Sequence, residues 1–334
     1  MRERFLVSGG AGFIASHLVD LLLAKGHDVL ILDALSWGSN LDNLPKDTKI
    51  VGGIHGQMVS EIPKGRVVLV VGDVADASLV QTLVDMTAGV FHLAAQTHVD
   101  RSYGDVIPFV TSNVVGAYSV LEAMRFAKYK KRCVFVSTDE VYGDIEKGFF
   151  KETDPPAPRN VYSTLKAGGD LLAQTYAAVF GVDVVIARPA NNYGPRQFEE
   201  KLIPRILTTF LRIALGEKVK IPIYGDGGQV RDWLYVRDTA NALFMLYQNG
   251  KAGQAYNLGA HQFRTVMEVV KAISEELNTS WEDHVTFTAD RIRGDRRYAL
   301  DLSKTDKEIG WHAWVDFPKG LKETVEWYNQ RPVR

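Results

Sequence analysis

The chain has 334 residues, of which 46% are hydrophobic and 24% are charged, so it can bury a sizeable core. Its 39 lysines and arginines nearly balance 40 aspartates and glutamates, and the net charge of −1 gives no basic excess for a nucleic-acid partner. The single cysteine, Cys133, excludes an intrachain disulfide and is typical of a reducing compartment, so we expect a cytoplasmic protein. The sequence has no long apolar segment, so we expect no membrane partner. Its eight histidines are scattered, so we expect no metal site.

The first half of the chain alternates short apolar runs with helical stretches. Strands are predicted at 5–7, 29–32, 67–71, 89–93, 133–137 and 182–187, with helices at 12–25, 107–127 and 161–180. Uninterrupted β-branched runs separated by helices are typical of a parallel sheet that is buried on both faces. This rhythm predicts a doubly wound, Rossmann-like α/β fold.

The rhythm changes after Arg188, where prolines and glycines mark loops and the strand–helix alternation becomes irregular. An amphipathic helix is predicted near 265–277 and an arginine-rich loop at 291–297. We therefore expect one domain over residues 1–188 and a second, smaller mixed α/β domain over 189–334. A segment near 230–260 can return to the first domain.

A glycine-rich turn joins the first strand to the first helix, with the spacing Gly9-x-x-Gly12-x-x-Ala15. Glycines at these positions allow backbone N–H groups and a helix N-terminus to approach a pyrophosphate. Asp33 ends the second strand, where a carboxylate binds the ribose hydroxyls of a dinucleotide and repels a 2′-phosphate. These features predict NAD as the cofactor, while a purely structural turn is the alternative.

Tyr162 and Lys166 are four residues apart on a predicted helix, so they lie on one face of it. A nearby ammonium lowers the pKa of a tyrosine, which can then take the proton of a sugar hydroxyl while the carbon delivers hydride to NAD. Thr138 follows the strand at 133–137, at the edge of the sheet where ligands bind. We interpret Thr138, Tyr162 and Lys166 as catalytic, with an ordinary surface pair as the alternative.

Two adjacent carboxyl groups, Asp139 and Glu140, come directly after Thr138. Mutual repulsion and partial burial can keep one of them protonated near neutral pH, so that it serves as an acid while the other serves as a base. A solvated turn or a helix cap explains the same spacing. The residues alone therefore leave both interpretations open.

Several longer strings extend over nearly the whole chain. They are Ser-Thr-Asp-Glu-Val-Tyr-Gly at 137–143, the segments 92–102 and 191–204, Arg-Asp-Trp-Leu-Tyr-Val-Arg-Asp at 231–238, and the pieces 290–291 and 295–301. Together with the glycine-rich turn, they resemble the extended, sugar-nucleotide-modifying branch of the short-chain dehydrogenase/reductase superfamily, and most of all its dTDP-glucose 4,6-dehydratases. The resemblance favours the acid–base interpretation of Asp139 and Glu140.

The resemblance also implies which residues bind the two ligands. For NAD they are Gly9, Gly12, Phe13, Ile14, Asp33, Asp73, Val74, Leu93, Ala94, Ala95, Tyr162 and Lys166. For a nucleotide sugar they are His98, Asn191, Asn192, Glu200, Lys201, Arg231, Arg297 and Tyr298. Among a cluster of arginines at 291, 293, 296 and 297, Arg297 is expected to join Arg231 in clamping the diphosphate. A homodimer is implied as well, with the helices at 107–127 and 163–180 forming a four-helix bundle.

The chain departs from the family pattern at a few positions. Gln96, Arg196, Glu199 and Gly294 stand where a glutamate, an aromatic residue, a proline and a histidine are more usual, and Ile292 and Arg293 are also uncommon. We expect these positions in or near the substrate pocket, so the nucleotide base and the sugar stay open.

The resemblance implies a lyase of deoxysugar biosynthesis, a nucleotide-sugar 4,6-dehydratase that converts an NDP-hexose to an NDP-4-keto-6-deoxyhexose. Tyr162, assisted by Thr138 and Lys166, takes the C4 hydroxyl proton as hydride passes to NAD. Glu140 then removes the C5 proton, Asp139 protonates the departing C6 hydroxyl, and hydride returns to C6.

Other functions are compatible with the same cofactor site. A 4-epimerase needs Tyr162 and Lys166 but no acid pair. A UDP-uronate decarboxylase needs a cation for the uronate carboxylate, for which Arg196 is a candidate. A 5,6-dehydratase is a further alternative, and a non-catalytic NAD-binding protein is a remote one, because fold alone does not set function.

Overall fold

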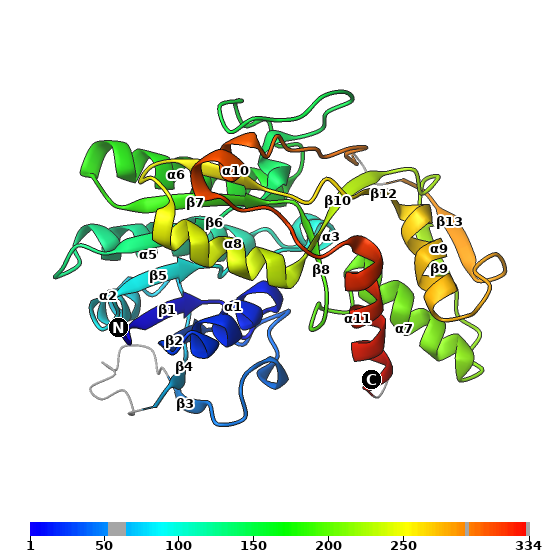
Figure 1. Cartoon of the computed structure of the whole chain (residues 1–334), viewed down its shortest axis with the longest axis horizontal. Helices are drawn as coiled ribbons and strands as arrows, with labels where there is room; N and C mark the ends of the chain where they lie inside the picture. The colour runs from blue at the N-terminus through cyan, green and yellow to red at the C-terminus, as the bar shows by residue number, and fades with distance from the viewer. Residues whose placement is uncertain (53–64, 291–293, 332–334) are drawn as a thin grey trace.

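A parallel sheet forms the centre of the molecule (Figure 1). The computed structural model describes residues 1–52, 65–290 and 294–331. Within them, eight strands pair in the order β11-β7-β6-β5-β1-β2-β4-β3, and every pairing is parallel. The strands are β1 (Arg4–Ser8), β2 (Asp28–Asp33), β3 (Lys49–Gly52), β4 (Val67–Val71), β5 (Gly89–His92), β6 (Arg132–Val136), β7 (Val184–Pro189) and β11 (Ala255–Leu258).

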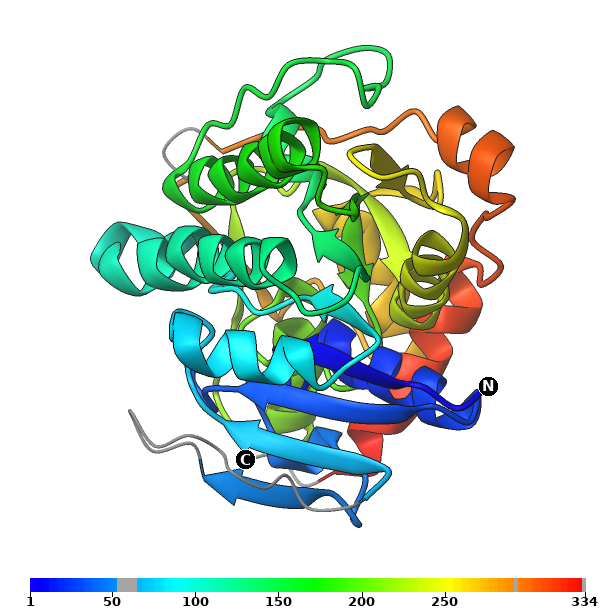
Figure 2. The same ribbon diagram turned by 90° about the vertical axis from the view of Figure 1, so that its left-hand side faces the viewer.

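Helices cover both faces of this sheet (Figure 2). One face carries α1 (Phe13–Ala24), α8 (Val236–Asn249) and α10 (Ser303–Ile309), and the other carries α2 (Ala77–Asp85), α5 (Gly116–Arg125) and α6 (Val161–Phe180). Because water reaches neither face, consecutive residues of a strand are apolar: Phe5, Leu6 and Val7 of β1 are all fully buried. The predicted Rossmann-like doubly wound fold is therefore confirmed.

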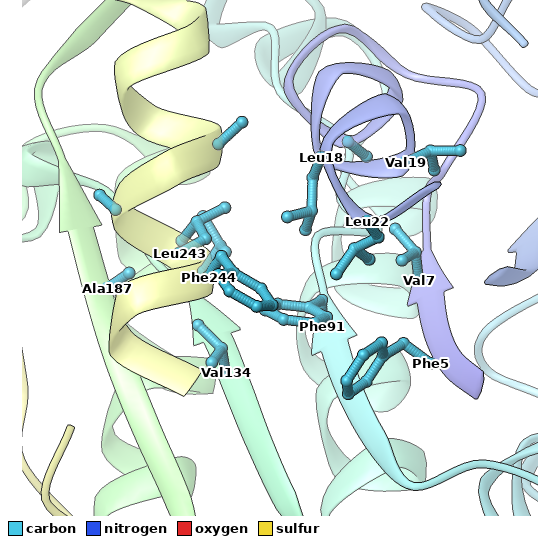
Figure 3. Packing of buried hydrophobic residues seen from close by; sticks show 14 of the residues in the cluster. Phe5, Val7, Leu18, Val19, Leu22, Phe91, Val134, Ala187, Leu243 and Phe244 are labelled. Atoms are coloured by element: carbon cyan, nitrogen blue, oxygen red, sulfur yellow. The ribbon is translucent and has the colours of Figure 1, made fainter. Parts of the chain in front are cut away.

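The first face shows how the layers interlock (Figure 3). Leu18 and Leu22 of α1 and Leu243 of α8 point into the same apolar layer, which also holds Phe5 and Phe91 from the sheet. The rings of Phe5 and Phe91 meet edge to face, with centroids 5.7 Å apart. A segment far along the chain thus completes the core beside the first helix.

The helix predicted at 107–127 is divided. It consists of α4 (Ile107–Val110), a π-helical turn η2 (Thr111–Val115) and α5. The side chain of Asn113, on the π turn, accepts from the backbone N–H of Gln96 at 2.8 Å and donates to its carbonyl at 3.0 Å. The widened turn, a feature frequent at functional sites, therefore holds the loop that follows β5.

A smaller mixed α/β unit lies beyond the carboxyl ends of the large sheet. It contains β8 (Asn191–Tyr193), β9 (Ile221–Tyr224), β10 (Val230–Tyr235), β12 (Phe263–Thr265) and β13 (Val285–Thr288), with α7 (Leu202–Ala214), α9 (Val266–Glu276) and α11 (Phe317–Asn329) packed on them. Three short helices complete the structure: η1 (Leu41–Asn43), α3 (Val99–Gly104) and η3 (Asp139–Tyr142). No helix of the described chain is both long and apolar enough to span a membrane.

The chain reverses its direction across the sheet between β1 and β5. From β1 it runs through β2 to β3 at one edge and returns to β4, and later it runs from β5 through β6 and β7 to β11 at the other edge. At such a switch point the loops after neighbouring strands diverge and leave a crevice at the carboxyl ends. This position decides where a ligand can bind.

A buried ion pair joins the sheet to α6. Arg188 of β7 donates to both carboxylate oxygens of Asp170, at 2.9 and 2.8 Å, and neither side chain is more than 2% exposed. Arg188 also donates to the Tyr142 hydroxyl at 2.6 Å, and Tyr142 donates to Asn257 at 2.8 Å. One guanidinium thereby connects β7, α6, η3 and β11.

We predict that Arg188→Met lowers the free energy of unfolding by about 3–5 kcal/mol, because it leaves the Asp170 carboxylate buried without its partner. Chemical denaturation followed by circular dichroism measures the change. Arg212→Met is the matched control, because Arg212 pairs with Glu217 where both side chains are 44% exposed. Equal denaturation midpoints for the two variants would contradict the prediction.

Candidate active site

A cavity of about 580 Å³ opens at the switch point. All the predicted cofactor contacts line it, from the turn after β1, the ends of β2, β4 and β5, and α6: Gly9, Gly12, Phe13, Ile14, Asp33, Asp73, Val74, Leu93, Ala94, Ala95, Tyr162 and Lys166. Six other predicted residues line the same cavity: Thr138, Asp139, Glu140, Asn191, Asn192 and Lys201. The fold thus brings the cofactor and catalytic candidates together.

The glycine-rich turn passes very close to the loop after β5. Gly9 has a φ of +73°, and a Cβ there would lie 2.9 Å from the Cα and N of Ala94. Gly12 caps α1 without a side-chain hydrogen bond, and Phe13 and Ile14 of the first turn line the cavity. Uncapped first-turn N–H groups suit an anion, so the turn fits the pyrophosphate of a dinucleotide.

Asp33 is fixed by three donors at the end of β2. Its carboxylate accepts from Ala11 N at 3.0 Å, Leu35 N at 2.8 Å and Ser39 Oγ at 2.7 Å. Two carboxylate oxygens offer about four lone-pair sites, so acceptor capacity remains on the side that faces the cavity. The residues present therefore fit NAD.

Tyr162 and Lys166 lie on the first turns of α6. Asn160 begins this helix with a capping box: its side-chain oxygen accepts from Ser163 N at 2.8 Å, and Ser163 Oγ accepts from Asn160 N at 3.3 Å. Lys166 is 5% exposed and donates to the carbonyl of Val136 at 2.7 Å. Burial lowers the pKa of Lys166 to about 8, against the opposing effect of Asp170.

The predicted lowering of the Tyr162 pKa is wrong for this structure. Burial raises that pKa well above its usual value, and the nearby Glu140 and Asp139 raise it further, while a hydrogen bond with Thr138 opposes them. The reason is geometric: the Lys166 ammonium is engaged by the carbonyl of Val136, and the charges that act on Tyr162 are carboxylates. The chain alone therefore keeps this phenol protonated.

The acid pair lies on η3, between β6 and α6. Asp139 is 3% exposed; one of its oxygens accepts from Thr138 Oγ1 at 3.2 Å, and the other has no hydrogen-bond partner among the described residues. Burial and the neighbouring Glu140 raise its pKa well above the usual value. Burial also raises the pKa of Glu140, but Lys201, Arg231 and a hydrogen bond from Asn160 oppose the rise. The two carboxyl groups thus have different surroundings, with fewer stabilising partners at Asp139.

A second cavity of about 210 Å³ adjoins the first, and Thr97, Glu140, Asn191 and Lys201 line both. Four more predicted substrate residues line the second cavity: His98, Glu200, Arg231 and Tyr298. Glu140 therefore lies where the two cavities meet, and Asp139 lines the first cavity.

Arg231 and Tyr298 lie together on the wall of the second cavity. The guanidinium of Arg231 is 4.3 Å from the ring centroid of Tyr298 and donates to the carbonyls of Asp295 and Val230, each at 2.8 Å. The Tyr298 hydroxyl donates to the carboxylate of Asp295. These contacts hold the arginine over the cavity.

The expected diphosphate contact of Arg297 is not supported. Its guanidinium donates to the carbonyl of Gly148 at 2.9 Å and lies 5.4 Å from the Phe149 ring, and it lines neither cavity. The preceding residue, Arg296, also points away from the cavities and forms an exposed ion pair with Asp226 at 2.8 Å. Residues 291–293, including two arginines of the predicted cluster, lie outside the described residues.

Glu200 connects three loops at the mouth of the cavities. Its carboxylate is 3.5 Å from His98 Nε2 and 3.3 Å from Arg101 Nε, and it accepts from Trp37 Nε1 at 3.2 Å. Arg101 lies 3.4 Å above the Trp37 ring. In this structure Glu200 therefore has protein partners from the loops after β2 and β5.

Arg196 is not placed to bind a uronate carboxylate. It lines neither cavity and pairs with Asp20 of α1 at 2.7 Å, with a backbone φ of +70°. Arg196 and Glu199 line neither cavity, although Gln197, Phe198 and Glu200 beside them do. Gln96 and Gly294 line the cavities as well.

Several cavity residues escaped the sequence analysis. They are Ser36 and Trp37 in the first cavity, and Asn160, Arg205 and Gln229 in the second. Asn160 could have been found, since an asparagine just before a predicted helix is a cap signal. The others carry no local signal, because tertiary contacts alone bring them to the site.

The fold and the site define an enzyme that works on a nucleotide sugar with a dinucleotide cofactor. The sequence model described as GDP-mannose 4,6-dehydratase matches residues 6–324. A dTDP-glucose 4,6-dehydratase from Actinoplanes sp. is 40% identical over 333 residues, covering 98% of both chains. The low-salt glycan biosynthesis protein Agl12 from Haloferax volcanii is 42% identical over 324 residues, covering 97% of both.

A solved structure agrees with these relatives. The dTDP-glucose 4,6-dehydratase DesIV from Streptomyces venezuelae, crystallised with NAD, superposes with a TM-score of 0.88 at 37% identity, covering 98% of this chain and 97% of that one. The chain therefore belongs to the GDP-mannose 4,6-dehydratase family. It is an NAD-dependent nucleotide-sugar dehydratase, a lyase, as the sequence predicted.

We predict that Gly9→Ala weakens NAD binding by at least about tenfold, or about 1.4 kcal/mol, because the new methyl group meets the Ala94 backbone and shifts the turn. Titration calorimetry measures the affinity. Gly26→Ala is the control: its φ of +86° imposes similar strain, but nothing lies within 4 Å of the added carbon. Equal affinities for the two variants would contradict this account.

Proposed function

We propose that this enzyme removes water from a nucleotide-linked hexose such as dTDP-glucose, forming the 4-keto-6-deoxy sugar. The observation that carries the proposal is the acid pair beside Thr138 and Tyr162, with Asp139 buried at the first cavity and the partly buried Glu140 where the two cavities meet. Residues 1–188, with α8 and β11, would hold the cofactor, and most of 189–334 the nucleotide sugar. The single buried cysteine, Cys133, supports a cytoplasmic location.

Tyr162 takes the proton of the C4 hydroxyl in this mechanism, while Thr138 orients that hydroxyl and Lys166 contributes positive charge. When bound, oxidised NAD supplies the acceptor for hydride from C4 and, once reduced, the donor that returns it to C6. The phenol needs this help to lose its proton, because burial and the acid pair raise its pKa.

Asp139 and Glu140 carry out the elimination. The 4-keto group acidifies C5–H, and Glu140 takes that proton. Asp139, whose pKa burial holds far above the usual range, gives its proton to the C6 hydroxyl, which leaves as water. After hydride reaches C6, Glu140 returns a proton to C5. Tyr162 then releases the proton that it took from the C4 hydroxyl, and Asp139 takes one up from solvent, so the net reaction is NDP-hexose to NDP-4-keto-6-deoxyhexose and water.

The site disfavours the alternatives. An epimerase has no use for an acid pair in the cavity, and burial of the Asp139 carboxyl group costs stability. A decarboxylase needs a cation for the uronate carboxylate, and Arg196 is paired with Asp20 outside the cavities.

We predict that one nucleotide hexose of a dTDP, UDP, GDP and CDP panel loses the mass of one water when incubated with the enzyme and NAD. Product mass spectrometry distinguishes the reactions, since decarboxylation loses carbon dioxide and epimerisation leaves the mass unchanged. Tyr162→Phe should form no product, because it lacks the group that takes the C4 proton. If no panel member loses the mass of one water, the dehydratase proposal fails.

We also propose that two copies associate through α5 and α6, which lie side by side on the sheet (Figure 1). Exposed apolar side chains collect there: Ile107, Val115, Tyr118, Phe126, Leu171, Val179 and Phe180. On α6, the exposed Thr164, Leu171, Thr175 and Ala178 recur at helical spacing and form one stripe. Such a patch marks a protein interface rather than a surface made for water.

We predict that Leu171→Glu yields monomers, because it buries a charge in the middle of this interface. Sedimentation velocity measures the change from the wild-type dimer. Phe287→Glu is the control, since Phe287 is similarly exposed, 56% against 48%, but lies on β13. A monomeric wild type, or an unchanged Leu171→Glu variant, would refute the interface.

A further inference from the structure

We propose that Asn160 is a positioning residue that holds Glu140 in place for the chemistry while it caps the helix that carries Tyr162. This inference rests on the proposed function of Glu140 as the base. It assigns a second task to a residue that a cap signal alone would explain.

The two ends of one amide have different partners. Oδ1 of Asn160 accepts from Ser163 N at 2.8 Å, which caps α6. Because Oδ1 is committed to the helix, the amino group Nδ2 must point the other way, and it donates to Glu140 Oε2 at 3.4 Å. Asn160 is 9% exposed and lines the second cavity beside Glu140, so this donor lies at the site.

The amide joins two elements that approach from different parts of the chain. Glu140 lies on η3 after β6, whereas Tyr162 and Lys166 lie on α6, and the loop from 143 to 159 separates them. Any other good cap would begin the helix equally well. Only a cap with a donor can also hold the base, and among the usual cap residues Asn offers an amide donor that Asp lacks.

Glu140 is surrounded by groups of both signs. Two cations face Glu140: Lys201, in the loop before α7, and Arg231, on β10. Asp139, on η3, and Asp295, in the loop before α10, add negative charge. Tyr162 and Tyr298 lie near it as neutral phenols. Asn160 contributes the one hydrogen bond from a side chain that the described residues give to the Glu140 carboxylate.

Removing this donor should therefore raise the pKa of Glu140, because burial already raises that pKa and Asn160 opposes the rise. A base works only above its pKa, so the acid limb of the pH–rate profile moves to higher pH. Asn160→Ser keeps the cap and replaces the amide donor with a hydroxyl on a shorter side chain. Asn160→Asp keeps the cap and places a carboxylate oxygen against Glu140, which should give the larger shift.

The test measures kcat/KM against pH for the wild type, Asn160→Ser and Asn160→Asp. We expect the acid limb to rise by about half a pH unit in Asn160→Ser and by about one unit or more in Asn160→Asp, where one unit is a tenfold change. Asp316→Asn is the matched control: it exchanges the same two groups at the cap of α11, far from the site, and should leave the limb unchanged. Thermal denaturation of all variants checks that the helix caps persist.

Two further measurements separate positioning from a structural effect. Adding Asn160→Ser to the Glu140→Gln variant should lower kcat/KM by less than about twofold, because residue 140 is then already neutral. If the two substitutions acted independently, their losses of kcat/KM would multiply. In single turnovers, formation of the reduced cofactor should keep its wild-type rate in Asn160→Ser, because Tyr162 is undisturbed. Multiplying losses, an unmoved acid limb, or an equal slowing of the first hydride step would each overturn the proposal.

A direct titration keeps this result distinct from the proposed function. The ¹³C resonance of the Glu140 carboxyl, assigned by its loss in Glu140→Gln, should titrate at higher pH in Asn160→Asp whatever the substrate is. If no nucleotide hexose loses water, the dehydratase proposal fails, while the titration still decides whether Asn160 holds Glu140.

Discussion

The buried ion pair between Arg188 and Asp170 is the constraint on which the geometry of this enzyme depends. It ties α6 to the edge of the sheet, and through the Tyr142 hydroxyl it ties η3 to the same point. Tyr162 and Lys166 lie on the first of these elements, and Asp139 and Glu140 on the second. A pair so deeply buried contributes little net stability, because desolvation offsets its attraction, but separating the two partners is costly, because it leaves a buried charge without its partner. It therefore holds the catalytic groups of two separate segments in one register.

Burial and neighbouring charges then give different pKa values to groups that are chemically alike. Asp139 and Glu140 are adjacent carboxyl groups, yet cations and an amide face Glu140, while one oxygen of Asp139 has no hydrogen-bond partner within the described chain. The same low-polarity surroundings raise the pKa of Tyr162 and lower that of Lys166. An acid, a base and a proton acceptor can thus work within one cavity near neutral pH, because position rather than residue type sets each protonation state.

Local patterns predicted the parts of the molecule that local physics controls. The parallel strands could be read as unbroken apolar runs, because both faces of the sheet are covered. Gly9, Gly12 and Asp33 could be placed in the cofactor cavity, because a tight turn and a helix N-terminus need those residues at that spacing. The adjacent Thr138, Asp139 and Glu140 could be placed at the edge of the sheet, because they follow a strand directly. Longer strings carried the family resemblance, which the comparisons confirm.

The sequence by itself therefore determined the fold class, the cofactor and the family, since each depends on periodicity, on spacing or on strings of neighbouring residues. Only the tertiary structure decided which cations reach the substrate cavity. Arg231 lies over it, whereas Arg297 turns to Gly148 and Arg196 to Asp20, although all three were candidates for binding the substrate in the sequence. It also decided the direction of the Tyr162 pKa, because Lys166 is held by the carbonyl of Val136 and two carboxyl groups from another segment approach the phenol. Such outcomes depend on which distant segments pack together, and spacing along one helix cannot encode that.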